Sequence, residues 1–246
     1  MKGSSILHKT IGILGGMGPA ATSDLMMKII DMTAADTDQD HIPMLIDSNT
    51  RISDRTAAIE GKGESPVPEM LASARKLEMA GADFIIIPCN TAHFFLPEIE
   101  GEINIPFLSM PLETARLLKQ SGVKSAAVLA TRGTYLSGLY DKILDSMGIQ
   151  TLNPDAEQQK TIMALIYDYI KKGVTEPAKL PRDEIIEITE DLKSRGAEAL
   201  LLACTELPLA FEIMDLFDES CVDPTAVLAA AAIREAGAEL RQAVAI

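Results

Sequence analysis

Short apolar runs alternate with longer amphipathic segments along the chain. Four of the runs, each flanked by Gly or polar residues, are IGIL at 11–14, DFIIIP at 83–88, AAVLA at 126–130 and ALLLA at 199–203. Runs of this kind are typical of buried parallel strands, and the segments between them are typical of helices. Helices are expected at 20–33, 68–80, 111–121, 135–147, 157–172, 183–195 and 225–241. The alternation predicts an α/β protein.

Glycines mark the expected ends of five of these helices, because glycine readily adopts the left-handed conformation that stops a helix. They are Gly81, Gly122, Gly148, Gly173 and Gly196. The Pro-containing stretch at 174–182 is predicted to be an exposed loop.

Two segments far apart in the sequence have the same pattern of residues. GADFIIIPCNT at 81–91 and GAEALLLACTE at 196–206 align with an offset of 115, since 204 − 89 = 115. The same offset places IGILGGMGP at 11–19 on AAVLATRGT at 126–134 and the segment 105–122 on 220–237. Landmarks that share one offset predict two related halves.

The predicted architecture is therefore two pseudo-symmetric, doubly wound parallel-sheet domains that arose by internal duplication. Open parallel sheets bind ligands at the carboxyl ends of their strands, so the active site is expected between the halves. The first half is predicted to comprise 1–107 together with 223–246, and the second half 108–222.

Composition narrows the classes of partner. Twenty-two basic residues against 36 acidic ones give a formal charge of −14, which repels nucleic acid and anionic membrane surfaces, so neither is expected to bind. No stretch is apolar for long enough to span a membrane, and no cleavage site follows the N-terminal apolar run, so a soluble cytoplasmic protein is expected. The 3 cysteines fit neither a disulfide framework nor a metal-binding spacing.

Cys89 and Cys204 occupy equivalent positions in the two halves. Each ends a buried strand and is followed by polar residues at a predicted helix start, where exposed N–H groups favour a thiolate. A buried free cysteine can also be an inert core residue. The equivalence of the two positions favours function, since one thiolate can remove a proton from a carbon while the opposing thiol supplies one. Disulfide exchange would normally use a Cys-x-x-Cys pair, which is absent.

Five motifs together carry a family resemblance. They are GGMGP at 15–19, ISDRTAAI at 52–59, PCNTAH at 88–93, TRGT at 131–134 and CTELP at 204–208. From residue 11 onward the chain resembles the aspartate/glutamate racemase family, and particularly its aspartate racemase branch. The resemblance implies that Cys89 and Cys204 are the two bases of a racemisation that needs neither pyridoxal phosphate nor another cofactor. It also implies two α/β domains and a homodimer.

The resemblance further implies two cationic substrate-binding residues. Arg55 and Lys171 match family positions that engage substrate carboxylates, Arg by a bidentate contact and Lys as a point charge. Two other interpretations stay open: Arg55 as a turn residue paired with Asp54, and Lys171 or its neighbour Lys172 as a solvated charge at a helix end.

Four polar residues resemble the family groups that hold the α-carboxylate beside the reacting carbon. They are Asn90, Thr91, Thr131 and Thr205. Such donors would also stabilise negative charge that develops on the carboxylate as the carbanion forms. Ordinary helix capping is the alternative, and one residue can do both.

Two residues are expected to support the cysteines. His93 lies four residues beyond Cys89, where a helix would let it orient or tune the thiolate, and Glu206 stands in a similar relation to Cys204. A structural histidine and an exposed helix-start carboxylate are the alternatives.

The glycine-rich segment GGMGP is expected to let the backbone approach the substrate, with Met17 near the cleft as a substrate-binding residue. It lacks the glycine spacings of nucleotide-binding loops, and Pro19 removes one N–H donor, so no nucleotide site is expected.

The preferred hypothesis is interconversion of L- and D-aspartate. Alternatives are a glutamate or broad-specificity amino-acid racemase, and a racemase or isomerase of another small acid such as a hydantoin or maleate. A non-catalytic protein whose two lobes close on a small acid is the contrasting class. A binding protein has no need of a thiol on each side of its ligand, which weighs against that class.

Overall fold

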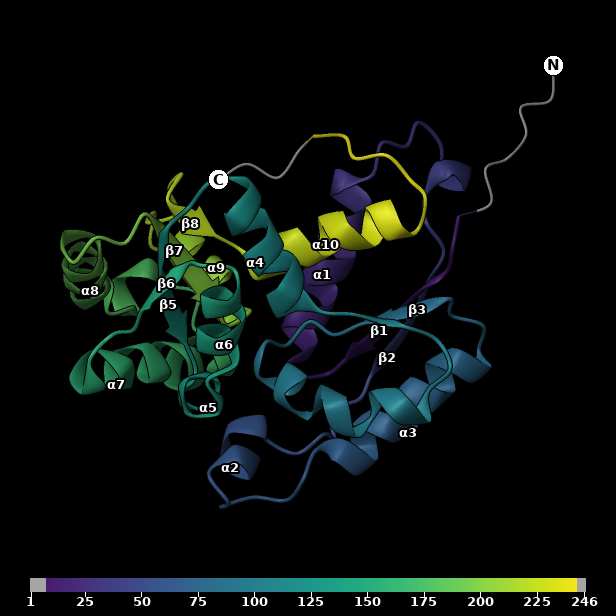
Figure 1. Cartoon of the computed structure of the whole chain (residues 1–246), viewed down its shortest axis with the longest axis horizontal. Helices are drawn as coiled ribbons and strands as arrows, with labels where there is room; N and C mark the ends of the chain where they lie inside the picture. The colour runs from purple at the N-terminus through teal and green to yellow at the C-terminus, as the bar shows by residue number, and fades with distance from the viewer. Residues whose placement is uncertain (1–7, 243–246) are drawn as a thin grey trace.

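In a computed structural model that describes residues 8–242, the chain forms two lobes, each built on a four-stranded parallel sheet (Figure 1). The first lobe contains β1 (Ile11–Gly15), α1 (Pro19–Met32), β2 (Met44–Ser48), α2 (Arg55–Ile59), α3 (Val67–Met79), β3 (Phe84–Ile86) and β4 (Phe107–Leu108). Next come α4 (Met110–Gln120), β5 (Ser125–Ala130), α5 (Arg132–Ser137), α6 (Leu139–Ser146), β6 (Gln150–Leu152) and α7 (Ala156–Ala164). The chain continues with α8 (Arg182–Ser194), β7 (Ala199–Ala203), α9 (Glu206–Ile213), β8 (Cys221–Val222) and α10 (Pro224–Glu235).

The two sheets have the same topology. Their strand orders are β2-β1-β3-β4 and β6-β5-β7-β8, and all neighbours pair in parallel. The repeat offset also holds for helices: α3 and α8 start at Val67 and Arg182, and 182 − 67 = 115. It fails for the edge strands β2 and β6, where 150 − 44 = 106. The predicted α/β fold with two related parallel sheets is confirmed.

Three predicted helices differ in detail from the structure. The segment 135–147 is two helices, because Gly138 between α5 and α6 has a φ of +60°. The segment 157–172 begins as α7, continues as the π-helical turn η4 (Leu165–Tyr169) and ends as the short 3-10 helix η5 (Ile170–Lys172). The last helix, α10, ends at Glu235 rather than 241.

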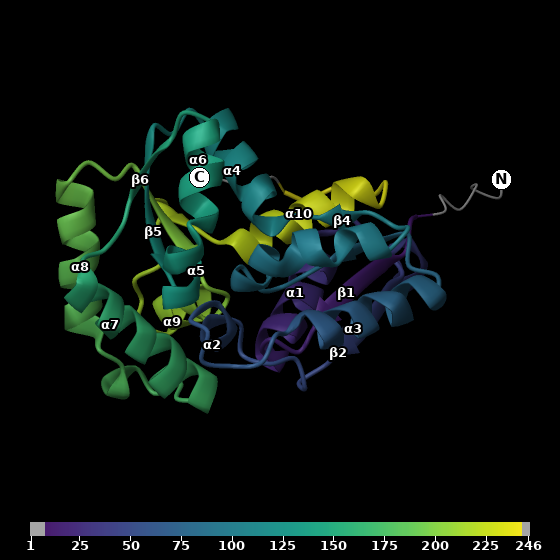
Figure 2. The same ribbon diagram turned by 60° about the horizontal axis from the view of Figure 1, so that its bottom comes forward.

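Helices α4 and α10 lie side by side where the lobes meet, as both ribbon views show (Figures 1 and 2). Leu228 and Ile233 of α10 share a core with Ile11 of β1, whereas Leu118 of α4 shares a core with Val128 of β5. Each helix also contributes to the other core, through Val227 of α10 and Met110 of α4. The exact boundaries of the two halves stay a prediction, and 1–7 and 243–246 lie outside the described residues.

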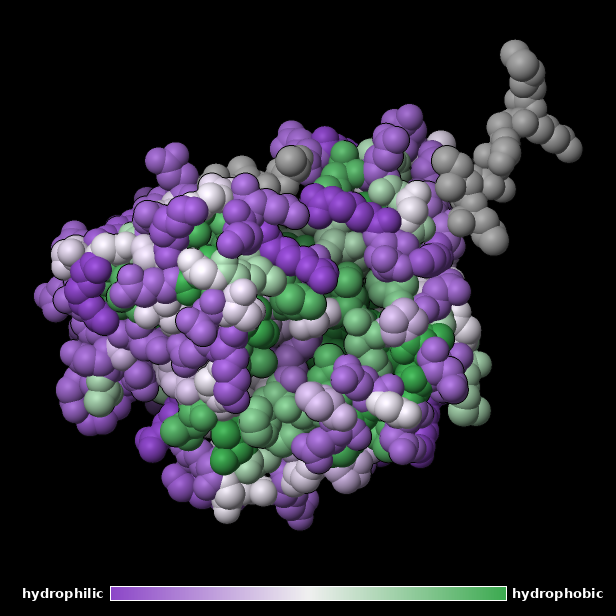
Figure 3. All heavy atoms as spheres, in the orientation of Figure 1, coloured by the Kyte–Doolittle hydropathy of each residue, from purple (hydrophilic) through white to green (hydrophobic). Residues whose placement is uncertain are grey.

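The loops that follow the central strands of both sheets meet between the lobes. Gly133, after β5, shows how closely: a Cβ there would lie 2.9 Å from Thr56 Oγ1 and 3.0 Å from Thr91 Cγ2 of the first lobe. Glycine is therefore required by the approach of the two halves. The surface in Figure 3 is mainly hydrophilic, with apolar groups gathered toward its middle. Among the described residues, no helix is long and apolar enough to cross a membrane.

The central strands should dominate stability. Leu201 in β7 is fully buried, so we expect Leu201→Ala to lower the free energy of unfolding by about 2–5 kcal/mol through lost burial and the cavity left behind. Urea denaturation measures this change, and Met79→Ala, at a side chain that is 86% exposed, is the control. Equal losses in the two variants would contradict this account of the core.

Candidate active site

Cys89 and Cys204 line one small cavity between the lobes. Each is 7% exposed, and the cavity has a volume of about 20 Å³, room for little more than a water molecule. Ten further residues line it: Met17, Arg55, Thr56, Asn90, Thr91, Thr131, Tyr167, Lys171, Thr205 and Glu206. Ten of the eleven residues that the sequence assigned to the site therefore lie around a single buried space. The exception is His93. An adjoining cleft of about 500 Å³ shares Met17, Arg55, Lys171, Thr205 and Glu206 with it.

Cys204 is held as a neutral thiol. Its Sγ donates a hydrogen bond to Glu206 Oε2 at 3.0 Å. Burial raises the pKa of Cys204 well above its usual range, and the negative charge of Glu206 raises it further, while Lys171 acts in the opposite direction. As expected from the sequence, the backbone N–H of Glu206 favours the thiolate, but it is the weakest of these influences on the pKa of Cys204 and does not offset burial and the charge of Glu206.

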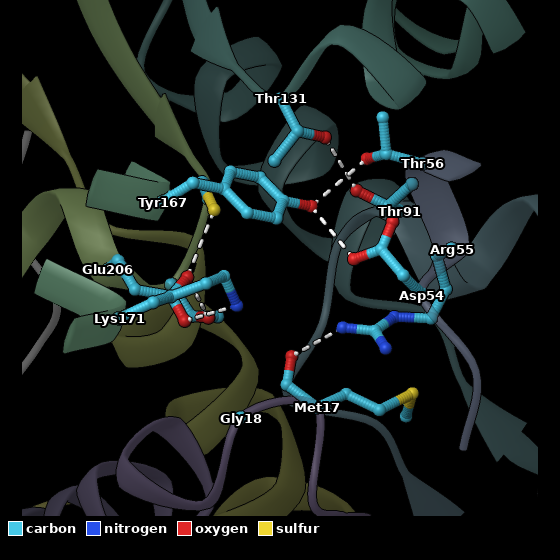
Figure 4. A network of polar contacts seen from close by, with 12 residues as sticks. Met17, Gly18, Asp54, Arg55, Thr56, Thr91, Thr131, Tyr167, Lys171 and Glu206 are labelled. Carbon is cyan, nitrogen blue, oxygen red and sulfur yellow. Dashed lines mark hydrogen bonds and ion pairs between the residues drawn. The ribbon is translucent and has the colours of Figure 1, made fainter. Parts of the chain in front are cut away.

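Lys171 points toward the cavity and not into solvent. Its Nζ lies 2.8 Å from Glu206 Oε1 and 5.5 Å from the centre of the Tyr167 ring (Figure 4). Burial alone would lower the pKa of Lys171, but the negative charge of Glu206, followed by Cys204, outweighs burial and raises it. Its neighbour Lys172 has a side chain that is 64% exposed and pairs with Asp168. The structure therefore places Lys171, and not Lys172, at the site.

Arg55 is buried at the other side of the cavity. Its guanidinium donates to the carbonyls of Met17 and Ser53, both at 3.1 Å, and its Nε is buried without a partner among the residues described. Burial by itself would lower the pKa of Arg55, but the charges of Cys89 and Asp54 outweigh it and raise the pKa. The Asp54 carboxylate instead caps α2, accepting from the Ala57 N–H at 2.8 Å. Arg55 therefore adds a positive charge beside Cys89.

Hydroxyl groups from both lobes meet beside Cys89. Thr91 Oγ1 lies 2.9 Å from the hydroxyls of both Thr131 and Thr134, which are 3.2 Å apart. Thr131 is also the N-cap of α5, so capping and a position in the site coexist there. Asn90 and Thr205 make no side-chain capping bond; the Thr205 hydroxyl donates to Glu206 Oε2 at 3.2 Å, and Asn90 Oδ1 accepts from the hydroxyl of Tyr140.

His93 contacts the backbone of Cys89 but not its thiol. Nδ1 donates to the Cys89 carbonyl at 2.9 Å, because Nε2 accepts from the Met110 N–H at 3.2 Å. Burial lowers the pKa of His93 to about 4, so the ring is neutral near pH 7. Of the two expected roles, the geometry supports orienting Cys89 through its backbone.

Tyr167 is a site residue that the sequence did not predict. It comes from the π-helical turn η4, and its hydroxyl donates to Asp54 Oδ2 at 3.0 Å and lies 3.3 Å from Thr56 Oγ1, which links the two lobes (Figure 4). Burial raises the pKa of Tyr167 to about 12. Nothing in the sequence distinguishes Tyr167 from Tyr169, because the register that selects it depends on the π turn.

Metal ligands are not grouped in the part of the chain that the structure describes: no three His, Cys, Asp or Glu residues could hold an ion there. The chemistry that the arrangement offers is proton transfer by thiols, with cations and hydrogen-bond donors for an anionic ligand.

Comparison with known proteins identifies relatives over most of the chain. A family model described as Asp/Glu/Hydantoin racemase matches residues 14–232. The broad specificity amino-acid racemase RacX of Bacillus subtilis is 31% identical over 205 residues, which cover 80% of this chain and 85% of that protein. The structure of Picrophilus torridus aspartate racemase is 36% identical with a TM-score of 0.82, over 95% of this chain and 96% of that one. An aspartate racemase homologue from Pyrococcus horikoshii shares the fold, with a TM-score of 0.73 at 24% identity over 93% and 99% of the two chains.

The Glu206 carboxylate should control the protonation of Cys204. In a variant whose only cysteine is Cys204, we expect Glu206→Gln to lower the pKa of the thiol by about one unit or more, because a nearby negative charge is lost and Lys171 is left unpaired. Thiolate absorbance followed against pH measures the shift. Glu212→Gln, at an exposed position on the same helix, is the control. A pKa that is unchanged or higher in Glu206→Gln would refute this assignment.

Proposed function

The chain belongs to the Asp/Glu/hydantoin racemase family, and we propose that it interconverts L- and D-aspartate without a cofactor, with Cys89 and Cys204 as the two bases. The observation that carries the proposal is that two thiols from equivalent positions of a duplicated fold line one buried cavity. A substrate carbon between them would have one thiol on each face. The homodimer implied by the family resemblance is part of the same proposal.

The proposed reaction moves two protons and exchanges the protonation states of the two cysteines, so that Cys89 ends as the thiol and Cys204 as the thiolate. In one direction the Cys89 thiolate takes the α-proton, the C–H electron pair stays on the carbon, and the Cys204 thiol donates its proton to the opposite face. In the reverse direction the two residues exchange roles. The neutral Cys204 thiol, hydrogen-bonded to Glu206, is ready to act as the acid in the first of these directions.

The carbanion is the species that most needs stabilisation, because its negative charge spreads onto the α-carboxylate. We assign the α-carboxylate to Asn90, Thr91, Thr131 and Thr205, which line the cavity between the thiols. Met17 would lie against the substrate, since it also lines this cavity.

The second carboxylate is assigned to Arg55 and Lys171. Both carry a buried or half-buried positive charge at the boundary between the inner cavity and the outer cleft. A guanidinium with an unpartnered Nε and an ammonium on the opposite side suit a dicarboxylate. The similarity to the structure of Picrophilus torridus aspartate racemase supports aspartate as the substrate.

A second candidate, a broad-specificity amino-acid racemase, is favoured by the outer cleft. Its volume of about 500 Å³ exceeds what the side chain of aspartate needs, and Ile52, Ile170 and Leu209 give it apolar walls. The relative RacX is named as a racemase of this kind. Both candidates use the same two cysteines and differ in which side chains the cleft admits.

The first test follows the racemisation of L- and D-aspartate by chiral chromatography, beside a panel of other amino acids and without added cofactor. We expect Cys89→Ala and Cys204→Ala each to lower the rate by about 100- to 10,000-fold, because each removes one of the two proton-transfer groups. Cys221→Ala is the matched control, since this buried cysteine belongs to the core of the second lobe. Racemisation of many amino acids would favour the second candidate. Absence of racemisation and of solvent deuterium at the α-carbon would refute both.

Two neighbouring lysines test the carboxylate assignment. We expect Lys171→Met to raise KM for aspartate roughly tenfold or more, because the substrate loses a half-buried ionic partner. Lys172→Met should leave KM unchanged, since that side chain pairs with Asp168 away from the cavity. An equal effect of the two substitutions on KM would contradict the assignment.

A further inference from the structure

Asn90 presents a free hydrogen-bond donor to the cavity. Its side chain is buried, its Oδ1 accepts a hydrogen bond from the hydroxyl of Tyr140, and its Nδ2 is buried with no partner in the described range 8–242. The amide lines the same cavity as both catalytic cysteines. Because a buried N–H without a partner is costly, this donor points to a ligand oxygen.

Tyr140 belongs to a different part of the molecule. It lies on α6 of the second lobe, is almost fully buried, and packs in the core with Leu144 and Val128. Burial raises the pKa of Tyr140 far above its ordinary value, so the phenol keeps its proton at any pH at which the protein works. The hydroxyl is therefore a permanent donor, held by a rigid core at 2.5 Å from Asn90 Oδ1.

A permanent donor selects one of the two orientations of an amide. An asparagine side chain has an accepting and a donating end, and a half-turn about its last bond exchanges them. With Tyr140 donating to Oδ1, the amino end faces the cavity. The reverse orientation would leave the phenol proton without that acceptor. It would also place a carbonyl oxygen against the substrate's carboxylate, and both effects are unfavourable.

We propose that Tyr140 is a positioning residue, whose hydroxyl orients the Asn90 amide so that Nδ2 faces the α-carboxylate of the substrate. This inference rests on the proposed function for the identity of the ligand, but the orientation itself is a property of the free protein. The bond also crosses from the second lobe to the loop of Cys89, so it couples the placement of that loop to the core of the opposite lobe.

The kinetic test uses Tyr140→Phe, which keeps the ring in the core and removes only the donor. We expect kcat/KM for aspartate to fall about tenfold or more, because a preorganised donor to the developing charge is lost. In an Asn90→Ala background the same substitution should cause no further loss, since the proposed role of Tyr140 is exerted through Asn90. The control is Tyr135→Phe, a half-buried tyrosine of this lobe whose hydroxyl bonds to the backbone of Val128 and Ala130.

A spectroscopic readout needs no substrate. The side-chain amide signals of Asn90 can be assigned in a proton–nitrogen correlation spectrum as those that Asn90→Ala removes. They should shift in Tyr140→Phe and stay in place in Tyr135→Phe. This result would support the positioning role even if the protein racemises no amino acid, which would refute the proposed function separately. Unshifted signals in Tyr140→Phe, or an equal kinetic loss with and without Asn90, would overturn the inference.

Discussion

Glu206 lies between the Cys204 thiol and the Lys171 ammonium, and its carboxylate bonds to both. The residue is buried, and a buried carboxylate is stable only with partners that satisfy it. The three groups therefore form one unit in which burial and the charge of Glu206 keep the thiol protonated, and the same charge holds the lysine toward the cavity. Both the protonation state of Cys204 and the position of the Lys171 ammonium depend on this contact.

The two halves share one topology, but different residues surround Cys89 and Cys204. Position 91 corresponds to 206, since 206 − 115 = 91, and it is a threonine whose hydroxyl meets two other threonines across the lobe boundary. Cys89 thus has neutral hydroxyls and the Arg55 cation nearby, whereas Cys204 has a carboxylate. A two-base reaction needs symmetric positions around the carbon together with one protonated and one deprotonated base. On the proposed function, shared topology places the two thiols symmetrically, and the loop of Cys204 supplies the protonated one.

The sequence predicts those features that depend on short segments of the chain. The cysteines were predictable because each ends an apolar run and because the repeat pairs them. What it missed depends on how the lobes pack: the hydroxyls of Tyr140 and Tyr167 reach residues of the other lobe, and no local pattern encodes that contact. The choice between Lys171 and Lys172 stayed open for a related reason, because the π-helical turn before them sets which one faces the cavity. The expected influence of helix N–H groups on Cys204 is present but outweighed by burial and the charge of Glu206, because the sequence shows the N–H groups and not the depth of burial.

The difference in size between the two spaces constrains how a substrate reaches the thiols. The inner cavity holds about 20 Å³ and the outer cleft about 500 Å³, and Lys171, Glu206, Arg55 and Met17 line both. An amino acid can lie between the cysteines only if these side chains move apart. A dicarboxylate brings its own partner for Lys171, so the free energy lost when the lysine leaves Glu206 is offset by the new ion pair. A neutral side chain brings no such compensation. On the proposed function, the buried ion pair at the mouth of the cavity therefore favours acidic substrates, even though the cleft outside has room for larger ones.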